Sequence, residues 1–397
     1  MHTSVQVTDN VYWVGVNDWE TCLFEAYWPL PYGISYNSYL ILDDKVALID
    51  AVKGLSFDVY LEKLRQVLPA GKGIDYLVIN HMEPDHSGAI ARLKELYPDM
   101  TLIGNKQTKR FLHEFFGLEQ DVQTIADGDT LELGRHTLQF NMTPMVHWPE
   151  TMMTYETSGK ILFSGDAFGT FGALAGGVFD DELAVDKYDD EILRYFANIV
   201  GKYSRMVQRA LKKLSELEIN VVASTHGPVW RRDTAAIINR YDKWSRHNTE
   251  TGVTIVYGSM YGNTTRMMEA LAKGLKESGI NNVPVHDVST SHPSYVLRDV
   301  WRYKGVVFGA PAYDQGLFPP MRQVIGLLQE KGLTKRIAGV FGSYGWSGGA
   351  VKALREFVEK ADWELVEPIV ETNCSPFAED LDKCRELGNE LAGRVIS

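Results

Sequence analysis

The chain has 397 residues, with 52 acidic and 40 basic side chains and a formal net charge of -12. This length fits two domains, and the acidic balance, without a dense run of Lys or Arg, argues against a general role on nucleic acid. The longest apolar stretches fall far short of the roughly 20 residues that span a membrane, and the first residues lack the pattern of a secretory signal. We therefore expect a two-domain cytoplasmic protein without nucleic-acid or membrane partners.

Three cysteines occur, Cys22, Cys374 and Cys384, and none of them forms a CxxC pair. This argues against structural disulfides, an iron-sulfur cluster and a Cys-ligated rubredoxin-type iron site. We expect three single thiols.

Residues 1–250 are predicted to form strands and hairpins interleaved with helices. Apolar runs separated by turns predict hairpins, apolar residues at helical spacing predict helices, and short apolar runs predict strands covered on both faces. In chain order these are a hairpin at 38–51, a helix at 57–68, a strand at 74–80, helices at 88–97 and 108–116 around a strand at 101–105, hairpins at 131–144 and 152–166, and a strand at 219–225. Residues 189–217 begin acidic and end rich in Lys, which predicts one long helix with Gly201 as its candidate point of interruption.

Residues 240–253 are polar and lack apolar periodicity, so we expect a domain boundary near residue 250. From there to residue 397 the chain alternates strands and helices. Apolar strand runs at 253–258, 283–288, 304–308 and 336–341 are interleaved with helical patterns such as 322–332 and 352–360. This alternation predicts a doubly wound parallel sheet.

Four predicted strands of the first domain end at residues that can bind metal. They run into His81, Glu83, Asp85 and His86, into His147, into Asp166 and into His226. Because strand ends on one edge of a sheet converge, we expect four imidazoles and three carboxylates in one pocket. A structural zinc takes four ligands, usually including Cys, whereas this set suits two metals about 3.5–4 Å apart with a shared carboxylate. The other histidines, His113, His136, His247, His286 and His292, lack a strand-end setting and are expected to be structural or surface residues.

The HxExDH stretch at His81, with His147 in VHWPE, Asp166 in SGDAF and His226 in THGP, resembles the metal set of the flavodiiron proteins. That resemblance implies a first domain with the metallo-β-lactamase fold, an αββα sandwich. Related zinc hydrolases carry HxHxDH, and Glu83 replaces their second imidazole with an anionic oxygen ligand that suits iron better. In the family pattern one iron is held by His81, Glu83 and His147, the other by Asp85, His86 and His226, and Asp166 bridges. The equivalent of His86 is displaced from the metal in some members.

Three strand ends of the second domain carry loops of small, polar and aromatic residues. The first loop, SMYGNT, precedes a helix, and the free N–H groups of a helix N-terminus can hold a phosphate. The loop contains neither a Walker motif nor a dinucleotide GxGxxG. Together with GAPAYDQG and GSYGWSGG, it resembles flavodoxin, which binds FMN non-covalently.

The resemblance to flavodoxin implies an FMN site made of these three loops. The first would hold the phosphate, and the other two would border the isoalloxazine, with Tyr313, Tyr344 and Trp346 as candidate ring contacts. The predicted residues are Ser259, Met260, Tyr261, Gly262, Asn263 and Thr264; Pro311, Ala312, Tyr313, Asp314, Gln315 and Gly316; and Ser343, Tyr344, Gly345, Trp346, Ser347 and Gly348.

The family resemblance covers nearly the whole chain and implies an activity. Flavodiiron proteins reduce dioxygen to water or nitric oxide to nitrous oxide, with FMN feeding a non-haem diiron site. They form head-to-tail homodimers that place the FMN of one protomer against the iron pair of the other, and dimers can pair into tetramers. The electron donor implied is external: a rubredoxin, a reductase or a reduced deazaflavin.

Four residues near the predicted metal site are expected to modulate it, and two of them, Tyr195 and Trp148, are the candidate catalytic residues. Trp148 would neighbour the flavin, and Tyr195 lies where members often carry a Tyr pair. The second Tyr is replaced here by Phe196. Glu25 stands near a position where several members carry a His, and this departure bears on proton delivery or on the preference between the two gases.

Two alternatives belong to other classes. The first is a zinc hydrolase fused to a flavodoxin-like domain, which makes Glu83 incidental and leaves the FMN loops without a task. The second is an electron-carrying module with a structural metal site. Metal content and the visible spectrum distinguish them from the redox enzyme.

Overall fold

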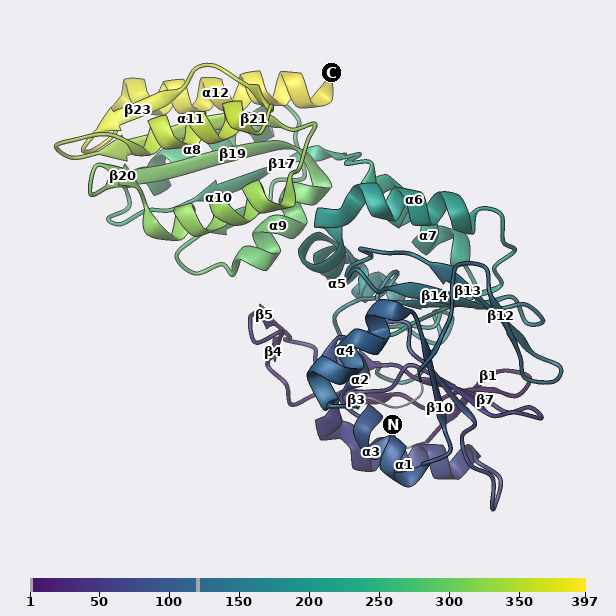
Figure 1. Ribbon diagram of the computed structural model, residues 1–397. Helices are drawn as coiled ribbons and strands as arrows, with labels where there is room; N and C mark the ends of the chain where they lie inside the picture. Colours follow the sequence, from purple (N-terminus) through teal and green to yellow (C-terminus); the bar gives the residue numbers. More distant parts are fainter. Residues whose placement is uncertain (1–2, 119–121) are drawn as a thin grey trace. The chain divides into compact units, whose positions relative to one another are not determined.

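The structure is a computed structural model that describes residues 3–118 and 122–397 (Figure 1). The chain divides into two compact units, one ending at Asp242 and the other beginning at Lys243. Among the described residues no helix combines the length and the apolar character needed to cross a membrane.

Two sheets form the centre of the first unit. A seven-stranded sheet has the order β1-β2-β7-β8-β9-β10-β11, and a five-stranded sheet has the order β12-β13-β14-β15-β16. The seven strands are β1 (Val5–Thr8), β2 (Val11–Trp13), β7 (Tyr39–Ile41), β8 (Ala47–Ile49), β9 (Tyr76–Val78), β10 (Thr101–Gly104) and β11 (Val122–Thr124). The five are β12 (Thr130–Glu132), β13 (Thr137–Met142), β14 (Met152–Glu156), β15 (Ile161–Gly165) and β16 (Val221–Ser224). The pairs β7–β8, β12–β13 and β14–β15 are the three predicted hairpins.

The two sheets face each other across one apolar core. Buried side chains of both sheets contribute, and the rings of Tyr39 and Phe163 meet across it at 5.2 Å. Helices lie on the outer sides (Figure 1). They are α1 (Phe57–Val67), α2 (Pro84–Ser87), α3 (Ile90–Leu96), α4 (Lys106–Phe116), α5 (Asp189–Tyr195), α6 (Ser204–Leu214) and α7 (Thr234–Ser245). The predicted αββα sandwich is confirmed.

The long helix predicted at 189–217 is interrupted around Gly201, as predicted, but the interruption begins before this glycine and continues after it. A π-helical segment at Phe196–Val200 and a 3-10 turn at Gly201–Tyr203 separate α5 from α6. π-Segments within helices often mark functional sites, because the extra residue re-aims neighbouring side chains. Here the segment directly follows Tyr195.

Two short ribbons lie outside the main sheets of the first unit. β3 (Val16–Asp18) pairs with β6 (Ile34–Tyr36), and β4 (Leu23–Phe24) pairs with β5 (Trp28–Pro29). The β4–β5 hairpin is closed by the Tyr27 amide, which donates to the Phe24 carbonyl.

The second unit is built on a parallel sheet of order β18-β17-β19-β21-β22, with β23 also on β21 and β20 on β19. The strands are β17 (Glu250–Tyr257), β18 (Val285–Asp287), β19 (Tyr303–Tyr313), β20 (Gly316–Leu317), β21 (Ile337–Tyr344), β22 (Glu364–Leu365) and β23 (Val370–Asn373). The helices are α8 (Asn263–Glu277), α9 (Pro293–Arg302), α10 (Pro319–Lys331), α11 (Ala350–Lys360) and α12 (Ala378–Ile396). This strand order is that of flavodoxin, whose ligand binds where the winding direction reverses, and the predicted doubly wound sheet is confirmed.

Candidate metal centre and flavin cavity

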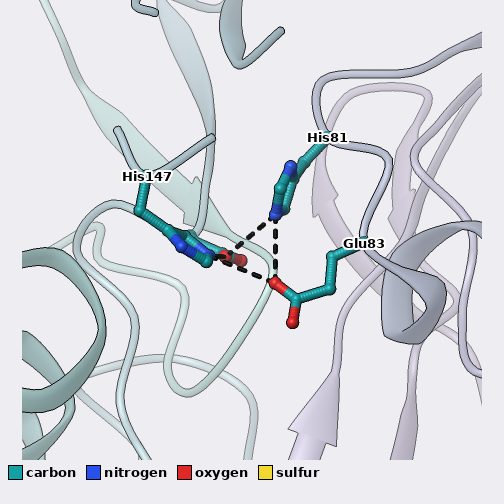
Figure 2. Close-up of side chains that lie close together, drawn as sticks. His81, Glu83 and His147 are labelled. Carbon is teal, nitrogen blue, oxygen red and sulfur yellow. Dashed lines mark hydrogen bonds and ion pairs between the residues drawn. The ribbon is translucent and has the colours of Figure 1, made fainter. Parts of the chain in front are cut away.

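The structure brings the seven predicted metal-binding side chains together. They lie in two groups, His81, Glu83, His147 and Asp166 in one and Asp85, His86 and His226 in the other, and within each group the ligand atoms lie within 4.8 Å of one another. In Figure 2 the side chains of His81, Glu83 and His147 point toward one another. The Glu83 carboxylate lies 3.2 Å from the Nε2 atom of each of these two histidines.

Asp166 faces both groups. Its Oδ2 atom lies 2.9 Å from Nε2 of His147 and 3.6 Å from Nε2 of His81. Its Oδ1 atom lies 2.9 Å from Nε2 of His86 and 3.6 Å from Nε2 of His226. One carboxylate that presents a different oxygen to each group is the geometry of a bridging ligand between two metals.

The expectation that these residues share one sheet edge is wrong in its detail. β13, β15 and β16 of the five-stranded sheet lead to His147, Asp166 and His226, but β9, which leads to His81, belongs to the seven-stranded sheet. The cluster therefore joins the two layers of the sandwich. Each layer is stiffened by its own ladder of hydrogen bonds, so the ligand set is held from both sides.

Pro84 separates the two metal-binding groups in the HxExDH stretch. It is the first residue of α2, while Glu83 before it has an extended backbone with φ -57° and ψ 140°. Proline disfavours a helical conformation for the preceding residue and suits the first helical position. The chain therefore turns between Glu83 and Asp85, and their side chains join different groups.

The buried polar atoms of the cluster fit a bound cation. The two oxygens of Asp85 and Nε2 of His226 are buried and have no hydrogen-bond partner among the described residues. Burial alone would lower the pKa of a histidine, yet Asp166 and Glu83 raise the pKa of His147 to about 9. Asp85 and Asp166 likewise raise the pKa of His86 to about 9 against the effect of burial. The carboxylates thus favour positive charge in their midst, which metal ions would supply.

A second layer of residues orients the histidines. Nδ1 of His81 lies 2.7 Å from Oε1 of Glu150, which also accepts a hydrogen bond of 2.9 Å from the Met82 amide. Nδ1 of His226 donates to the Ser35 carbonyl at 2.7 Å. Both contacts leave Nε2 free to face the metal, and such partners fix the tautomer and the ring orientation. Sequence reasoning missed Glu150, whose only signal is its place in VHWPE.

The four residues predicted to modulate the site take different positions. Tyr195 is fully buried with its ring 5.5 Å from that of His226, and its hydroxyl has no hydrogen-bond partner among the described residues. Trp148 packs edge-on against His81 at 5.2 Å. Phe196 packs against Tyr241. Partial burial, together with the Glu83 carboxylate, raises the pKa of Glu25 to about 7.

The histidines left out of the metal set lie elsewhere. His136 and His286 each contact a buried carboxylate, Glu156 at 3.1 Å and Asp299 at 2.8 Å respectively. The three cysteines are all free thiols.

The three predicted flavin loops surround a cavity of about 320 Å³ in the second unit. All eighteen predicted residues line it except Gly262, Tyr313, Gly316 and Gly348, and Cys374 joins them. At its base the hydroxyls of Thr264 and Ser343 lie 3.1 Å apart, and at its rim Tyr261 and Trp346 are 91% and 78% exposed. Hydroxyls beside the start of α8 suit a phosphate, and exposed aromatic rings suit a planar ligand.

The predicted loop from Pro311 to Gly316 is shorter in the structure. β19 continues to Tyr313 and pairs with β20, so only Asp314 and Gln315 form the turn, both with positive φ. The sequence around Tyr313 contains Pro and Gly, which predict a loop, but strand pairing extends through them.

Comparisons with known proteins agree with both sites. Residues 34–227 match the family described as ODP family beta lactamase, and residues 255–388 match flavodoxin. A protein named nitric oxide reductase, from Moorella thermoacetica, is 33% identical over the full length of both chains. The structure of rubredoxin oxygen:oxidoreductase from Desulfovibrio gigas superposes with a TM-score of 0.94 and 28% identity, covering 99% of this chain and 98% of that one. The flavodiiron protein of Giardia intestinalis superposes with a TM-score of 0.94 and 30% identity, covering 99% and 97%.

Proposed function

This chain belongs to the flavodiiron protein family, and from that premise we propose that it is a cytoplasmic oxidoreductase that reduces dioxygen to water, nitric oxide to nitrous oxide, or both. Its cofactors are FMN and a pair of non-haem irons. Residues 1–250 would hold the irons and residues 251–397 the FMN. The single observation that carries the proposal is Asp166, whose two oxygens face two separate groups of ligands.

When bound, FMN can accept two electrons and release them singly to irons that alternate between ferrous and ferric states, which suits the reduction of a small molecule by several electrons. The chain's own residues hold and shape that centre. His81, Glu83 and His147 would bind one iron, and Asp85, His86 and His226 the other, with Asp166 between them. Glu83 and Asp166 give the first group two anionic oxygens, a donor set that suits iron better than zinc.

Tyr195 is the proposed hydrogen-bond donor of the site. Burial, together with the negative charge of Asp166, raises the pKa of its hydroxyl, so the group stays protonated. Its proton has no other acceptor among the described residues. It is therefore available to a ligand beside His226. Tyr195→Phe should keep the iron content and slow turnover, and equal turnover would remove Tyr195 from the mechanism.

We propose that electrons reach the flavin from an external donor, a rubredoxin, a reductase or a reduced deazaflavin. The name of the Desulfovibrio gigas relative supports a rubredoxin. We also propose a head-to-tail homodimer, with pairing into tetramers as its extension, in which Trp148 neighbours the partner's flavin. The exposed rings of Tyr261 and Trp346 at the cavity rim support a covering partner. A forced monomer should keep both cofactors and lose turnover.

The cytoplasmic location is supported by the three free thiols, since reducing compartments keep cysteines unpaired. Fractionation of cells that produce the full chain tests it. Recovery of the protein in an extracytoplasmic fraction would refute it.

The experiment for the activity gives the reduced, iron- and FMN-loaded protein each gas and follows its consumption. Consumption of either gas with formation of water or nitrous oxide supports the proposal. A fully loaded protein that consumes neither would refute it. Zinc content with hydrolytic turnover would favour the hydrolase alternative.

A further inference from the structure

The β4–β5 hairpin places two consecutive residues against the two metal-binding groups. The ring of Phe24 packs edge-on against that of His226, with centroids 5.6 Å apart. The next residue, Glu25, interacts through its carboxylate with Glu83 of the other group. Both Glu25 and Ala26 have positive φ, 49° and 55°, which turns the chain sharply over the cluster.

Phe24 completes an aromatic enclosure around His226. Its ring is 4% exposed and also lies 5.6 Å from Phe171 and 6.3 Å from Tyr195. Tyr36 packs on His226 from a further direction at 5.7 Å. The rings of Phe24, Tyr36 and Tyr195 therefore pack around this histidine, and Phe171 supports two of them, those of Phe24 and Tyr195.

The side of the cluster that is partly open to solvent includes Glu83, the residue with which Glu25 of the hairpin interacts. The side chains of Glu83 and Asp85 are 11% and 13% exposed, whereas those of His81, His86 and His226 are fully buried. Together with His147, whose side chain is 8% exposed, Glu83 and Asp85 are the metal-binding residues nearest to solvent, so we expect a ligand to reach the metals past this side. Glu25, which contacts Glu83, and Phe24 next to it border that approach.

The hairpin is fixed to the body of the first unit through α5. Arg194 is fully buried and donates a hydrogen bond of 2.8 Å to the Pro29 carbonyl at the end of β5. Its guanidinium also forms an ion pair with Glu191 and lies 4.3 Å from the ring of Phe171. Since Arg194 precedes Tyr195, one anchor positions both the hairpin and the proposed hydrogen-bond donor.

We propose that Phe24 is a specificity-determining residue, which limits the ligand admitted beside His226 to the size of a diatomic gas. The inference rests on the proposed function, because it concerns the ligand of that same metal pair. Removing the ring should admit longer ligands, since discrimination of this kind is made by a steric wall rather than by an added attraction. Leu23, the neighbouring residue of β4, is 44% exposed and provides a matched control.

The test titrates the oxidised holoprotein with azide, a linear triatomic anion, and follows the change in visible absorption. Phe24→Ala should bind azide at least about fivefold more tightly than wild type, while Leu23→Ala should stay within about twofold. Unchanged azide affinity in Phe24→Ala, or an equal gain in Leu23→Ala, would overturn the proposal. If Phe24→Ala loses iron, Phe24→Leu decides, because a gain supports the proposal and the wild-type value overturns it. If fully loaded wild type consumes neither gas, the proposed function is refuted, but the comparison of azide affinities still tests the role of Phe24.

Discussion

Glu150 should control how tightly the first metal-binding group holds iron. It is fully buried, and one of its oxygens accepts from both His81 and the Met82 amide, at 2.7 and 2.9 Å. Glu150→Gln keeps the shape and leaves an oxygen to accept both hydrogen bonds, so the charge is what it removes. Residues that orient metal-binding histidines change metal affinity by about 10- to 100-fold, or about 1.4 to 2.7 kcal/mol. We expect a loss of iron affinity in that range.

The assay is an anaerobic competition for ferrous iron between the apoprotein and a coloured chelator. Glu156→Gln is the matched control, because Glu156 is also fully buried and contacts a histidine, His136, that lies outside the metal cluster. Both substitutions should lower thermal stability, because each places an amide N–H group in a buried site. A buried polar group without a partner costs about 1–3 kcal/mol. Iron affinity within about twofold of wild type in Glu150→Gln would refute the reasoning, as would an equal loss in Glu156→Gln.

Three further predictions concern stability and cofactor binding. Burial lowers the pKa of Lys63 to about 8 from an ordinary value of 10.5, so its positive charge destabilises the folded protein below pH 8, and this penalty disappears as the pH rises to 10.5. In urea unfolding, the free energy of unfolding of wild type should therefore increase by about 3 kcal/mol relative to that of Lys63→Met over this pH window. A constant difference between the two proteins would contradict the prediction. Gly388→Ala should destabilise the second unit by about 1–3 kcal/mol in thermal unfolding, because the added Cβ would lie 2.3 Å from the Leu271 carbonyl oxygen. Gly393→Ala, on the same helix, meets no atom within 4 Å and should be neutral or stabilising. Equal effects of the two substitutions would argue against close packing of α8 on α12. Trp346→Ala should weaken FMN binding by about tenfold in a fluorescence titration, through loss of ring stacking, and unchanged affinity would place the flavin ring elsewhere.

The architecture and the metal-binding residues could be predicted from the sequence, but their arrangement in space could be predicted less well. Strand-end residues such as His81 and Asp166 stand out because each follows an apolar run, and the structure brings them together. Which sheet each strand joins depends on long-range pairing, so the division of the ligands between two sheets could not be read from local patterns. The same holds for the extension of β19 to Tyr313, where pairing with β20 outweighs the turn preference of Pro and Gly.

The supporting residues leave almost no local signal. Glu150 is one carboxylate in a loop, and its role depends on a contact with His81 across 69 positions of the chain. Phe24 reads as an ordinary apolar residue of an irregular segment, and only the fold shows its ring against His226. The role of such residues depends on the distance and orientation between side chains. Local sequence patterns say little about this geometry when the contacting residues are far apart in the chain.

The most direct test of the central claim is the magnetic state of the iron-loaded protein. If Asp166 bridges two irons, the protein should bind two irons per chain, and one-electron reduction of the diferric form should give the spectrum of an exchange-coupled mixed-valent pair. Asp166→Ala should abolish that coupling. A single iron per chain, or two irons whose magnetic signals are independent in wild type, would contradict the account.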